Sequence, residues 1–341
     1  MIKYAHVGLP KCGSTWLQTR FFPNHPELFH LGKFATPLGL PFVLRRLFFS
    51  DLIETSRYEF DATDYRKLFR DYHAQAEAEQ GKRAIGISLE SINLLSIGRV
   101  DLDERAQRLL DIMGSDTRVI FLIREQCSWL TSLYCTLVKE GGLTLSFEDW
   151  CFYTCYERDY GLYANLLYDR IYQSYANRVG IENVLVLFFE EFSKDTTGSI
   201  AQFCDFVGVS RFGQVDASPV HQKADPETLG AMLALNRKWK FALGRDRFKR
   251  LGPHRLQEWY TEVCKIPLPD HFESDKQRHR IMYTAPENVR RIAQEECGSY
   301  ESVDLTMPDS VKTDLHRLLA PHNRNLIQLS GLDLGRYGYA L

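Results

Sequence analysis

The 341-residue sequence predicts an α/β fold, in which a central parallel sheet is flanked by helices and followed by a mostly helical C-terminal extension. The main observation is the order of the elements along the chain. In the first two-thirds, short apolar runs with strand propensity alternate with segments of helix length and spacing. Connections of this length join parallel strands. After about residue 222 the pattern is mostly helical.

The expected strands are short and mostly apolar, whereas the expected helices carry apolar residues at helical spacing. The clearest inner strand is RVIFLI, because it is apolar almost throughout. In chain order the expected strands are residues 2–8, 83–88, 118–123 and 184–189, and the expected helices are residues 14–22, 64–79, 102–113, 126–139 and 160–178. The sequence contains no internal repeat, low-complexity tract or clear linker. We therefore expect one domain, 1–341, with an α/β core at 1–209 and a helical part at 210–341.

The first expected strand leads directly into a turn, PKCGSTW at residues 10–16, which opens a helix. A strand followed by a Gly/Lys/Ser/Thr turn at a helix N-terminus is typical of an anion site, because exposed backbone N–H groups and the helix dipole point at the bound group. Lys11 adds a mobile positive charge, and Ser14 and Thr15 add hydroxyl donors. The sequence therefore predicts a phosphate-type ligand at this turn.

The turn departs from a nucleoside triphosphate loop in two ways. Gly8 and Gly13 have the Walker A spacing, but Ser14 stands where the lysine is expected, and Lys11 precedes the second glycine. The strand at 118–123 is followed directly by Arg124. At this position a nucleotide hydrolase or kinase would have an acidic residue that holds Mg²⁺. Arginine suits a bare phosphate through a bidentate hydrogen bond. Both departures favour a nucleotide that is bound without a metal ion.

These motifs resemble those of the sulfotransferases that use 3′-phosphoadenosine 5′-phosphosulfate (PAPS). The turn PKCGSTW looks like the family's 5′-phosphosulfate loop, and Arg124 with Ser132, eight residues later, looks like its 3′-phosphate pair. Residues 183–192 and 200–208 are similar to a strand, acidic turn and helix of bacterial-type members, so the resemblance covers about residues 2–209. It implies a P-loop-like sulfotransferase fold, PAPS as donor and adenosine 3′,5′-bisphosphate as product. It also places Trp16 where relatives stack an aromatic ring on adenine.

The resemblance implies roles for several side chains in a metal-free transfer. Backbone amides from Cys12 through Gly13 to Thr15 would hold the 5′-phosphate, and Lys11 would neutralise charge on the leaving group. Two residues are candidates for the general base. Glu90 follows the strand at 83–88 and should reach the same sheet edge as the turn; cytosolic relatives have a histidine at about that place. His30 is the alternative, because glycan-type relatives place their base after the first helix.

Composition limits the other classes of function. The formal net charge of −2 gives no overall attraction to nucleic acid or anionic membranes. No stretch approaches the ~20 apolar residues of a transmembrane helix. Strand-like sequence begins at Ile2, so we expect no leader or anchor and a cytoplasmic location. The eight cysteines form no CxxC pair, and no His or Cys cluster completes a zinc site beside Cys151 and Cys155, so we expect reduced thiols and no metal site.

Two other classes of function stay open. A P-loop kinase with a degenerate Walker A motif would need Glu190 or Glu191 to hold Mg²⁺, and a non-catalytic module would retain the nucleotide site without a base. The sequence gives no oligomeric state. The basic residues at 237–250 are either a solvated helical face or a rim that attracts anions. For an enzyme, the aromatic-rich segments at 32–57 and 140–160 suit a small-molecule or carbohydrate acceptor.

Overall fold

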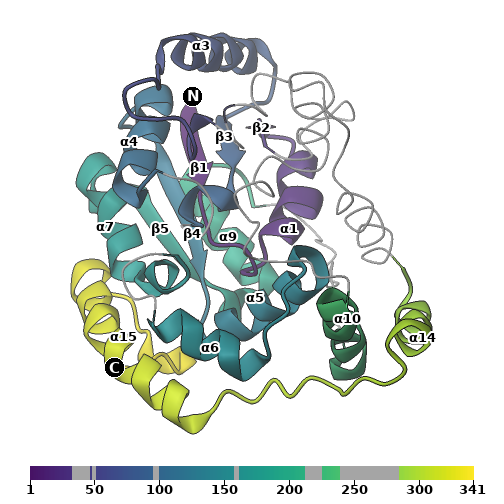
Figure 1. Ribbon diagram of the computed structural model, residues 1–341. Helices are drawn as coiled ribbons and strands as arrows, with labels where there is room; N and C mark the ends of the chain where they lie inside the picture. Colours follow the sequence, from purple (N-terminus) through teal and green to yellow (C-terminus); the bar gives the residue numbers. More distant parts are fainter. Residues whose placement is uncertain (33–46, 48–50, 95–99, 157–160, 212–224, 239–283) are drawn as a thin grey trace. The chain divides into compact units, whose positions relative to one another are not determined.

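Five parallel strands form one sheet in the order β2-β3-β1-β4-β5 (Figure 1). The computed structural model describes residues 1–32, 47, 51–94, 100–156, 161–211, 225–238 and 284–341. The strands are β1 (Ile2–His6), β2 (Leu28–His30), β3 (Ala84–Ser88), β4 (Arg118–Ile123) and β5 (Val184–Phe188). The predicted fold class, a central parallel sheet flanked by helices, is confirmed.

Helices cover both faces of this sheet. Figure 1 shows α4 (Leu102–Met113) and α7 (Tyr168–Val179) on one side of the strands, and α1 (Ser14–Trp16) and α9 (Thr196–Val207) on the other. Side chains of β4 alternate between these layers, as the period of a strand requires. Phe121 contacts Tyr172 of α7, and the Arg118 guanidinium lies over the ring of Phe206 in α9.

The parallel order brings three chain segments to one edge of the sheet. β1 lies between β3 and β4, and its last residue, His6, is level with Ser88 and Ile120. The turn after β1, the segment after β3 and the segment after β4 therefore leave the sheet side by side. Ligands of parallel α/β sheets bind at this carboxyl edge.

Several elements differ from the predicted pattern. The helix at 147–156 was not predicted, and the helix expected at 14–22 is divided into a short α-helix (14–16), a π-helix (17–21) and a 3-10 helix (22–24). β2 was not predicted, because LFH is too short to show a period and forms a strand only by pairing with β3. The helix expected from residue 160 begins at Tyr168, because Leu167 has non-helical torsions (φ −85°, ψ 72°). The other elements are α3 (Thr63–Ala78), α5 (Gln126–Gly141), α6 (Phe147–Tyr156), α8 (Phe189–Phe192), α10 (Pro226–Lys238), α14 (Pro286–Cys297), α15 (Asp309–Ser330), η1 (Leu17–Phe21), η2 (Phe22–Asn24), η4 (Glu90–Asn93), η5 (Tyr163–Leu166), η6 (Ile181–Asn183) and η9 (Gly335–Tyr337).

The chain divides into two compact units. The first contains residues 1–129, 157–220 and 313–341, and the second contains residues 130–156 and 221–312. In this grouping the residues after 209 are shared between the units, and the single-domain assignment stays a prediction. In the described part of the chain, no helix is both long and apolar enough to cross a membrane.

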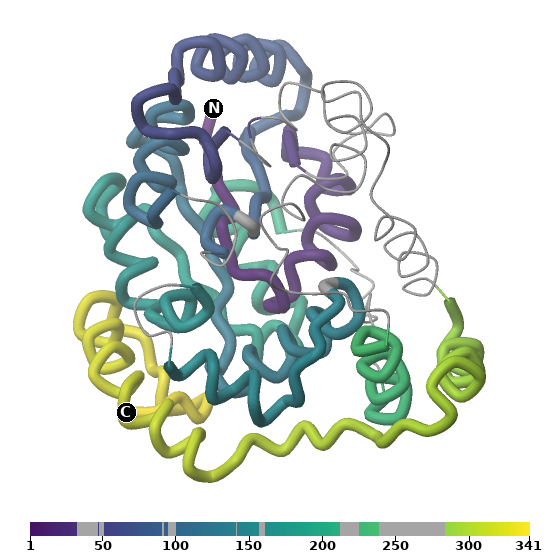
Figure 2. The backbone as a smooth tube through the Cα atoms, viewed as in Figure 1, coloured from purple at the N-terminus to yellow at the C-terminus, as the bar shows by residue number. Residues whose placement is uncertain are grey.

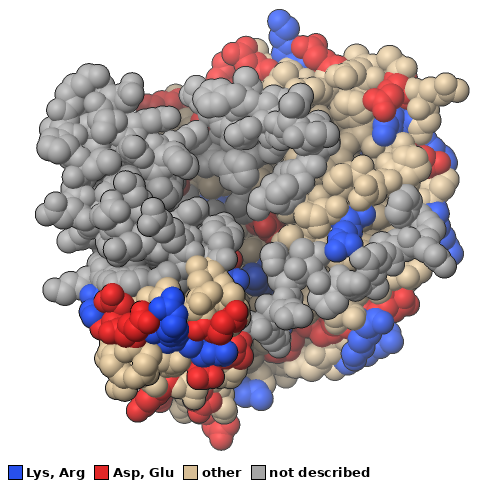
Figure 3. Space-filling model, turned by 90° about the vertical axis from the view of Figure 1, so that its right-hand side faces the viewer, with Lys and Arg blue, Asp and Glu red and all other residues tan. Residues whose placement is uncertain are grey.

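In the second unit, α10 packs against α14 and forms hydrogen bonds at the end of α5. The side-chain amide of Asn236 donates to the carbonyls of Val138 and Leu143, at 2.8 and 3.0 Å. Figure 3 shows acidic and basic side chains intermixed on the described parts of the face that it presents. In the second unit, Lys238 and Glu296 form an ion pair at 3.0 Å. Within the basic run predicted at 237–250, only residues 237 and 238 lie in the described part of the chain.

The C-terminal segment belongs to the first unit and packs beside β5 (Figure 2). The ring of Tyr337 lies 4.5 Å from that of Phe188, and the amide of Asn323 in α15 accepts a hydrogen bond from Gln126 at 2.7 Å. The C-terminus is therefore tied to the same sheet edge at which the predicted nucleotide motifs lie.

Candidate anion-binding and active site

The turn after β1 has an unusual backbone. Gly13 has a left-handed φ of 92°, and Lys11 has a φ of 68°. Among the described residues, Lys11 is the one non-glycine with positive φ. This conformation costs a non-glycine residue about 1–2 kcal/mol and is found most often at functional sites. A Cβ on Gly13 would lie 3.0 Å from the ring of Phe192, so close packing also requires glycine there.

Four backbone amides of this turn are available to a ligand. Within the described part of the chain, the N–H groups of Cys12, Gly13, Ser14 and Thr15 donate to no other group. The amides that follow are already used, because Trp16 N–H donates to the Gly13 carbonyl at 3.0 Å. Successive unpaired amides in such a turn form a concave anion site. These four amides could hold an anion, and the phosphate-type ligand stays a prediction.

The turn is held rigidly through its carbonyls. The buried Trp129 indole donates to the Pro10 carbonyl at 2.8 Å. Nη1 of Arg124 donates to the Lys11 carbonyl at 3.2 Å. Because these bonds use carbonyl oxygens, they fix the loop while leaving its amides free. Trp129 was missed by sequence reasoning, since nothing local relates it to a turn 119 residues away.

The side chains of the turn divide into buried and accessible groups. Ser14 is 2% exposed and its hydroxyl donates to the Leu9 carbonyl at 3.4 Å, whereas Lys11 and Thr15 are partly exposed. Trp16 is 5% exposed and packs edge-to-face against Phe192, with ring centroids 5.4 Å apart. This is the packing of a core side chain, and adenine stacking by Trp16 stays a prediction.

Arg124 lies at the end of β4, at the edge where the turn lies. Its Nε donates to Ser128 Oγ at 2.9 Å, and its guanidinium lies 4.5 Å from the centroid of the Phe189 ring. In the described structure, no carboxylate forms an ion pair with Arg124 or Lys11. Arg124 is 7% exposed, and a buried guanidinium without a paired anion is costly, so this edge favours an anionic ligand.

Cys12 is fully buried, and the charges of Lys11 and Arg124 act on its thiol. Burial, the largest effect, raises the pKa of its thiol strongly. Arg124 and Lys11 act to lower that pKa, while Glu190 and Glu90 act to raise it. The thiol therefore stays protonated at neutral pH, and the turn uses Cys12 through its backbone.

Ser132 and Ser128 differ in their relation to Arg124. Ser132 belongs to the part of α5 in the second unit, so its role at the 3′-phosphate stays a prediction. Ser128 contacts Arg124 directly and was not predicted. Its four-residue spacing from Arg124, at the start of a helix, is the signal that identifies it.

The two candidate bases differ in accessibility. Glu90 begins η4 directly after β3, is partly exposed, and has no ion pair or side-chain hydrogen bond with other described residues. His30, at the end of β2, is 8% exposed; its Nδ1 pairs with the Tyr4 hydroxyl at 2.9 Å, and its ring stacks on Phe22. Burial lowers the pKa of His30 to about 3. The geometry therefore favours Glu90 as a base that a substrate can reach.

A buried polar network supports the same sheet edge. Nδ1 of His6 lies 2.7 Å from Ser88 Oγ, which also accepts a hydrogen bond from Gln18 at 3.0 Å. These residues join β1 and β3 to the helical segment that follows the turn. Sequence reasoning missed this network, because its members lie up to 82 residues apart.

The two acids that a kinase would need are engaged in hydrogen bonds. One oxygen of Glu190 accepts from the Glu125 backbone at 2.8 Å, and the other accepts from the Tyr339 hydroxyl at 3.4 Å. Glu191 accepts from the Tyr337 hydroxyl at 3.0 Å. These contacts give both carboxylates a structural role, which is to attach the C-terminal segment.

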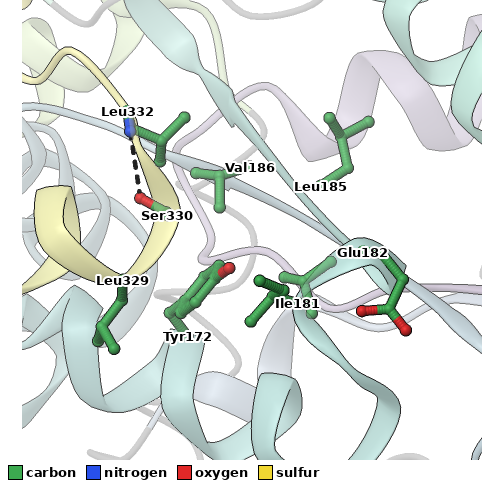
Figure 4. Close-up of a pocket in the computed structure, with 9 residues that line it drawn as sticks. Tyr172, Ile181, Glu182, Leu185, Val186, Leu329, Ser330 and Leu332 are labelled. Atoms are coloured by element: carbon green, nitrogen blue, oxygen red, sulfur yellow. Dashed lines mark hydrogen bonds between the residues drawn. The ribbon is translucent and has the colours of Figure 1, made fainter.

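A separate pocket of about 400 Å³ lies beside the outer strand β5 (Figure 4). Its lining is mostly apolar, and it contains none of the predicted site residues. The lining residues are Tyr172, Ile181, Glu182, Val184, Leu185, Val186, Leu329, Ser330 and Leu332.

Among known proteins, matches to this chain are found in solved structures. No family model matches the chain, and no curated protein is similar to it. A solved structure of a sulfotransferase from Alicyclobacillus acidocaldarius has 22% sequence identity and a TM-score of 0.45, covering 79% of this chain and 97% of that chain. At this identity and score, the similarity says nothing about the reaction of the present chain.

Proposed function

We propose that the chain transfers a sulfonate group from PAPS to a hydroxyl or amine of a small-molecule or carbohydrate acceptor, without a metal ion. The observation that carries the proposal is the hydrogen bond from the Arg124 guanidinium to the Lys11 carbonyl. It joins two motifs that are 113 residues apart in sequence. Both motifs resemble nucleotide-binding motifs of the same sulfotransferase family.

The free amides and unpaired cations suit the two phosphate groups of such a donor. In this proposal the amides from Cys12 to Thr15 hold the 5′-phosphate, and Arg124 holds the 3′-phosphate, with Ser132 as a further donor. Charge-assisted hydrogen bonds of this kind are about twice as strong as neutral ones. The rigid turn supplies them without rearrangement, which is the condition for electrostatic stabilisation of a transition state.

Transfer needs little further chemistry from the protein. The bond between sulfur and the bridging phosphate oxygen breaks, and a bond from sulfur to the acceptor oxygen or nitrogen forms. Lys11 neutralises the charge that develops on the bridging oxygen, and Glu90 takes the acceptor's proton. The products are the sulfated acceptor and adenosine 3′,5′-bisphosphate.

A thermal-shift measurement separates this proposal from a kinase. We expect adenosine 3′,5′-bisphosphate to raise the melting temperature without added metal, because a ligand at 100 times its Kd stabilises the folded state by about 2.7 kcal/mol. ADP with Mg²⁺ is the comparison ligand. Stabilisation by ADP with Mg²⁺ alone would overturn the proposal.

An activity assay separates an enzyme from a binding module. We expect the chain to release adenosine 3′,5′-bisphosphate from PAPS in the presence of members of a panel of phenols, alcohols and sugars. Binding of the product nucleotide without turnover on any panel member would favour the non-catalytic alternative.

A further inference from the structure

Three metal-ligating side chains meet where α5 begins, directly after Arg124. One ligand atom each from Glu125, Cys127 and His316 lies within 4.8 Å of the other two. Glu125 and Cys127 come from the start of α5, and His316 comes from α15, 189 residues further along the chain than Cys127. Sequence spacing gave no sign of this cluster, and we had expected no metal site.

The distance between sulfur and nitrogen fits joint coordination of one ion. In a tetrahedral zinc site, bonds of about 2.3 Å to sulfur and about 2.0–2.1 Å to nitrogen place these two atoms about 3.5–3.6 Å apart. Sγ of Cys127 and Nε2 of His316 lie 3.7 Å apart. The same distance is also compatible with a hydrogen bond from thiol to imidazole, so the two explanations need a direct test.

The Glu125 carboxylate is already oriented by the start of α5. Its Oε1 accepts from the Cys127 N–H at 2.9 Å, and its Oε2 accepts from the Ser128 N–H at 2.8 Å. The Glu125 N–H in turn donates to Glu190 at 2.8 Å. Each carboxylate oxygen keeps a lone pair for a metal, and hydrogen bonds of this kind fix the direction of a ligand.

Burial is that expected of a site with one open position. Cys127 is 9% exposed, whereas Glu125 and His316 are partly exposed. An ion could therefore enter and retain a water molecule as its fourth ligand. The sulfur, nitrogen and oxygen set suits a borderline-soft divalent ion and disfavours Mg²⁺ and Ca²⁺, which prefer oxygen ligands.

We propose that Glu125, Cys127 and His316 bind one Zn²⁺ ion, which links α15 to the start of α5. The site does not depend on the proposed sulfonate transfer, because its ligands are not those of the donor nucleotide. Its consequence is structural: a bound ion would fasten the C-terminal segment to the element that follows Arg124.

The test uses the reduced, tag-free full chain with Co²⁺ as a spectroscopic probe and Zn²⁺ as its competitor. We expect one equivalent of Co²⁺ to give a thiolate-to-cobalt charge-transfer band and the intense visible bands of a tetrahedral ion, which Zn²⁺ then removes. Cys127→Ser should abolish the charge-transfer band. His316→Gln removes a ligand and should weaken Zn²⁺ binding by more than the roughly 10–100-fold that changes to outer-shell partners cost. One equivalent of Zn²⁺ should raise the melting temperature of the unaltered chain but not of the variants.

The control is Cys297→Ser in α14, because Cys297 is a partly exposed free thiol outside the cluster. This variant should bind Co²⁺ as the unaltered chain does. His316 is partly exposed, so His316→Gln keeps the test valid should Cys127→Ser fail to fold. Absence of a tetrahedral thiolate spectrum, or a spectrum that survives Cys127→Ser, would overturn the proposal and leave a thiol–imidazole hydrogen bond.

Discussion

Replacing Lys11 by glycine should separate stability from activity. In its left-handed conformation Lys11 carries a backbone cost of about 1–2 kcal/mol, which glycine does not. The greater freedom of glycine in the unfolded chain offsets about 0.5–1 kcal/mol of that gain. Because Lys11 forms no ion pair among the described residues, little else is lost. We therefore expect the free energy of unfolding to rise by about 0.5–1 kcal/mol.

The same variant should lose most of its activity. Removing a group that stabilises charge in a transition state typically lowers kcat by about 10²–10³-fold. The rate of adenosine 3′,5′-bisphosphate release under saturating PAPS measures this loss, and denaturant unfolding measures the gain in stability. A purely structural residue would not produce opposite changes in the two quantities.

Two further variants are controls for Lys11→Gly. Lys11→Ala removes the same charge but keeps a Cβ at positive φ, so it should lose activity without gaining stability. Lys312→Gly places glycine at an exposed position of α15 and should destabilise the chain by about 1 kcal/mol without changing kcat. If Lys11→Gly lowers stability together with activity, or keeps full activity, the assignment of Lys11 as a strained functional residue is wrong.

Three other outcomes follow from the structure. Arg124→Lys should weaken binding of adenosine 3′,5′-bisphosphate by roughly 10–150-fold in calorimetry, because about 1.5–3 kcal/mol of charged hydrogen bonding is lost. Binding of adenosine 5′-monophosphate should weaken less, through loss of the bond to the Lys11 carbonyl alone, and Arg118→Lys, at the other end of β4, should change neither affinity. Glu90→Gln should lower kcat by roughly 10²–10⁴-fold with product affinity unchanged, and unchanged turnover would favour His30 as the base. Burial lowers the pKa of His6 to about 3 from 6.5, so the unfolded chain binds more protons and stability falls as the pH drops below about 6.5. At pH 5 protonation of His6 in the unfolded chain lowers the free energy of unfolding by about 2 kcal/mol relative to pH 8. Thermal melts of His6→Asn, which keeps a donor near Ser88, should show a flatter pH dependence.

The sheet was predictable because its inner strands are buried on both faces. Such strands are continuous apolar runs, as in residues 118–123, and the segments between them are long enough for helical crossovers. The same reasoning placed Arg124 at the carboxyl edge, since it directly follows such a run. β2 could not be predicted, because three residues are too few to show an alternating pattern. Its pairing with β3 is decided by tertiary contacts.

Residues of the candidate site could be proposed from the sequence only where they lie in the segments that follow strands. Lys11, Glu90 and Arg124 satisfy this condition, and the parallel sheet brings their segments to one edge. Trp129, which fixes the turn, and His316, which meets Cys127, lie on helices whose sequence gives no sign of their partners. Contacts between helix faces depend on how the helices pack, and a single sequence does not specify that packing.

The positive φ of Lys11 connects the fold to the proposed chemistry. The left-handed conformation of Lys11 is held by two hydrogen bonds from outside the turn. Trp129 donates to the Pro10 carbonyl, and Arg124 donates to the Lys11 carbonyl. The core thus supplies the rigidity that keeps a strained turn in place, and four amides of that turn donate to no other described group. In the proposed complex the 5′-phosphate satisfies those amides, and the 3′-phosphate pairs with Arg124. Ligand binding should therefore relieve unsatisfied groups at the sheet edge without reorganising the fold.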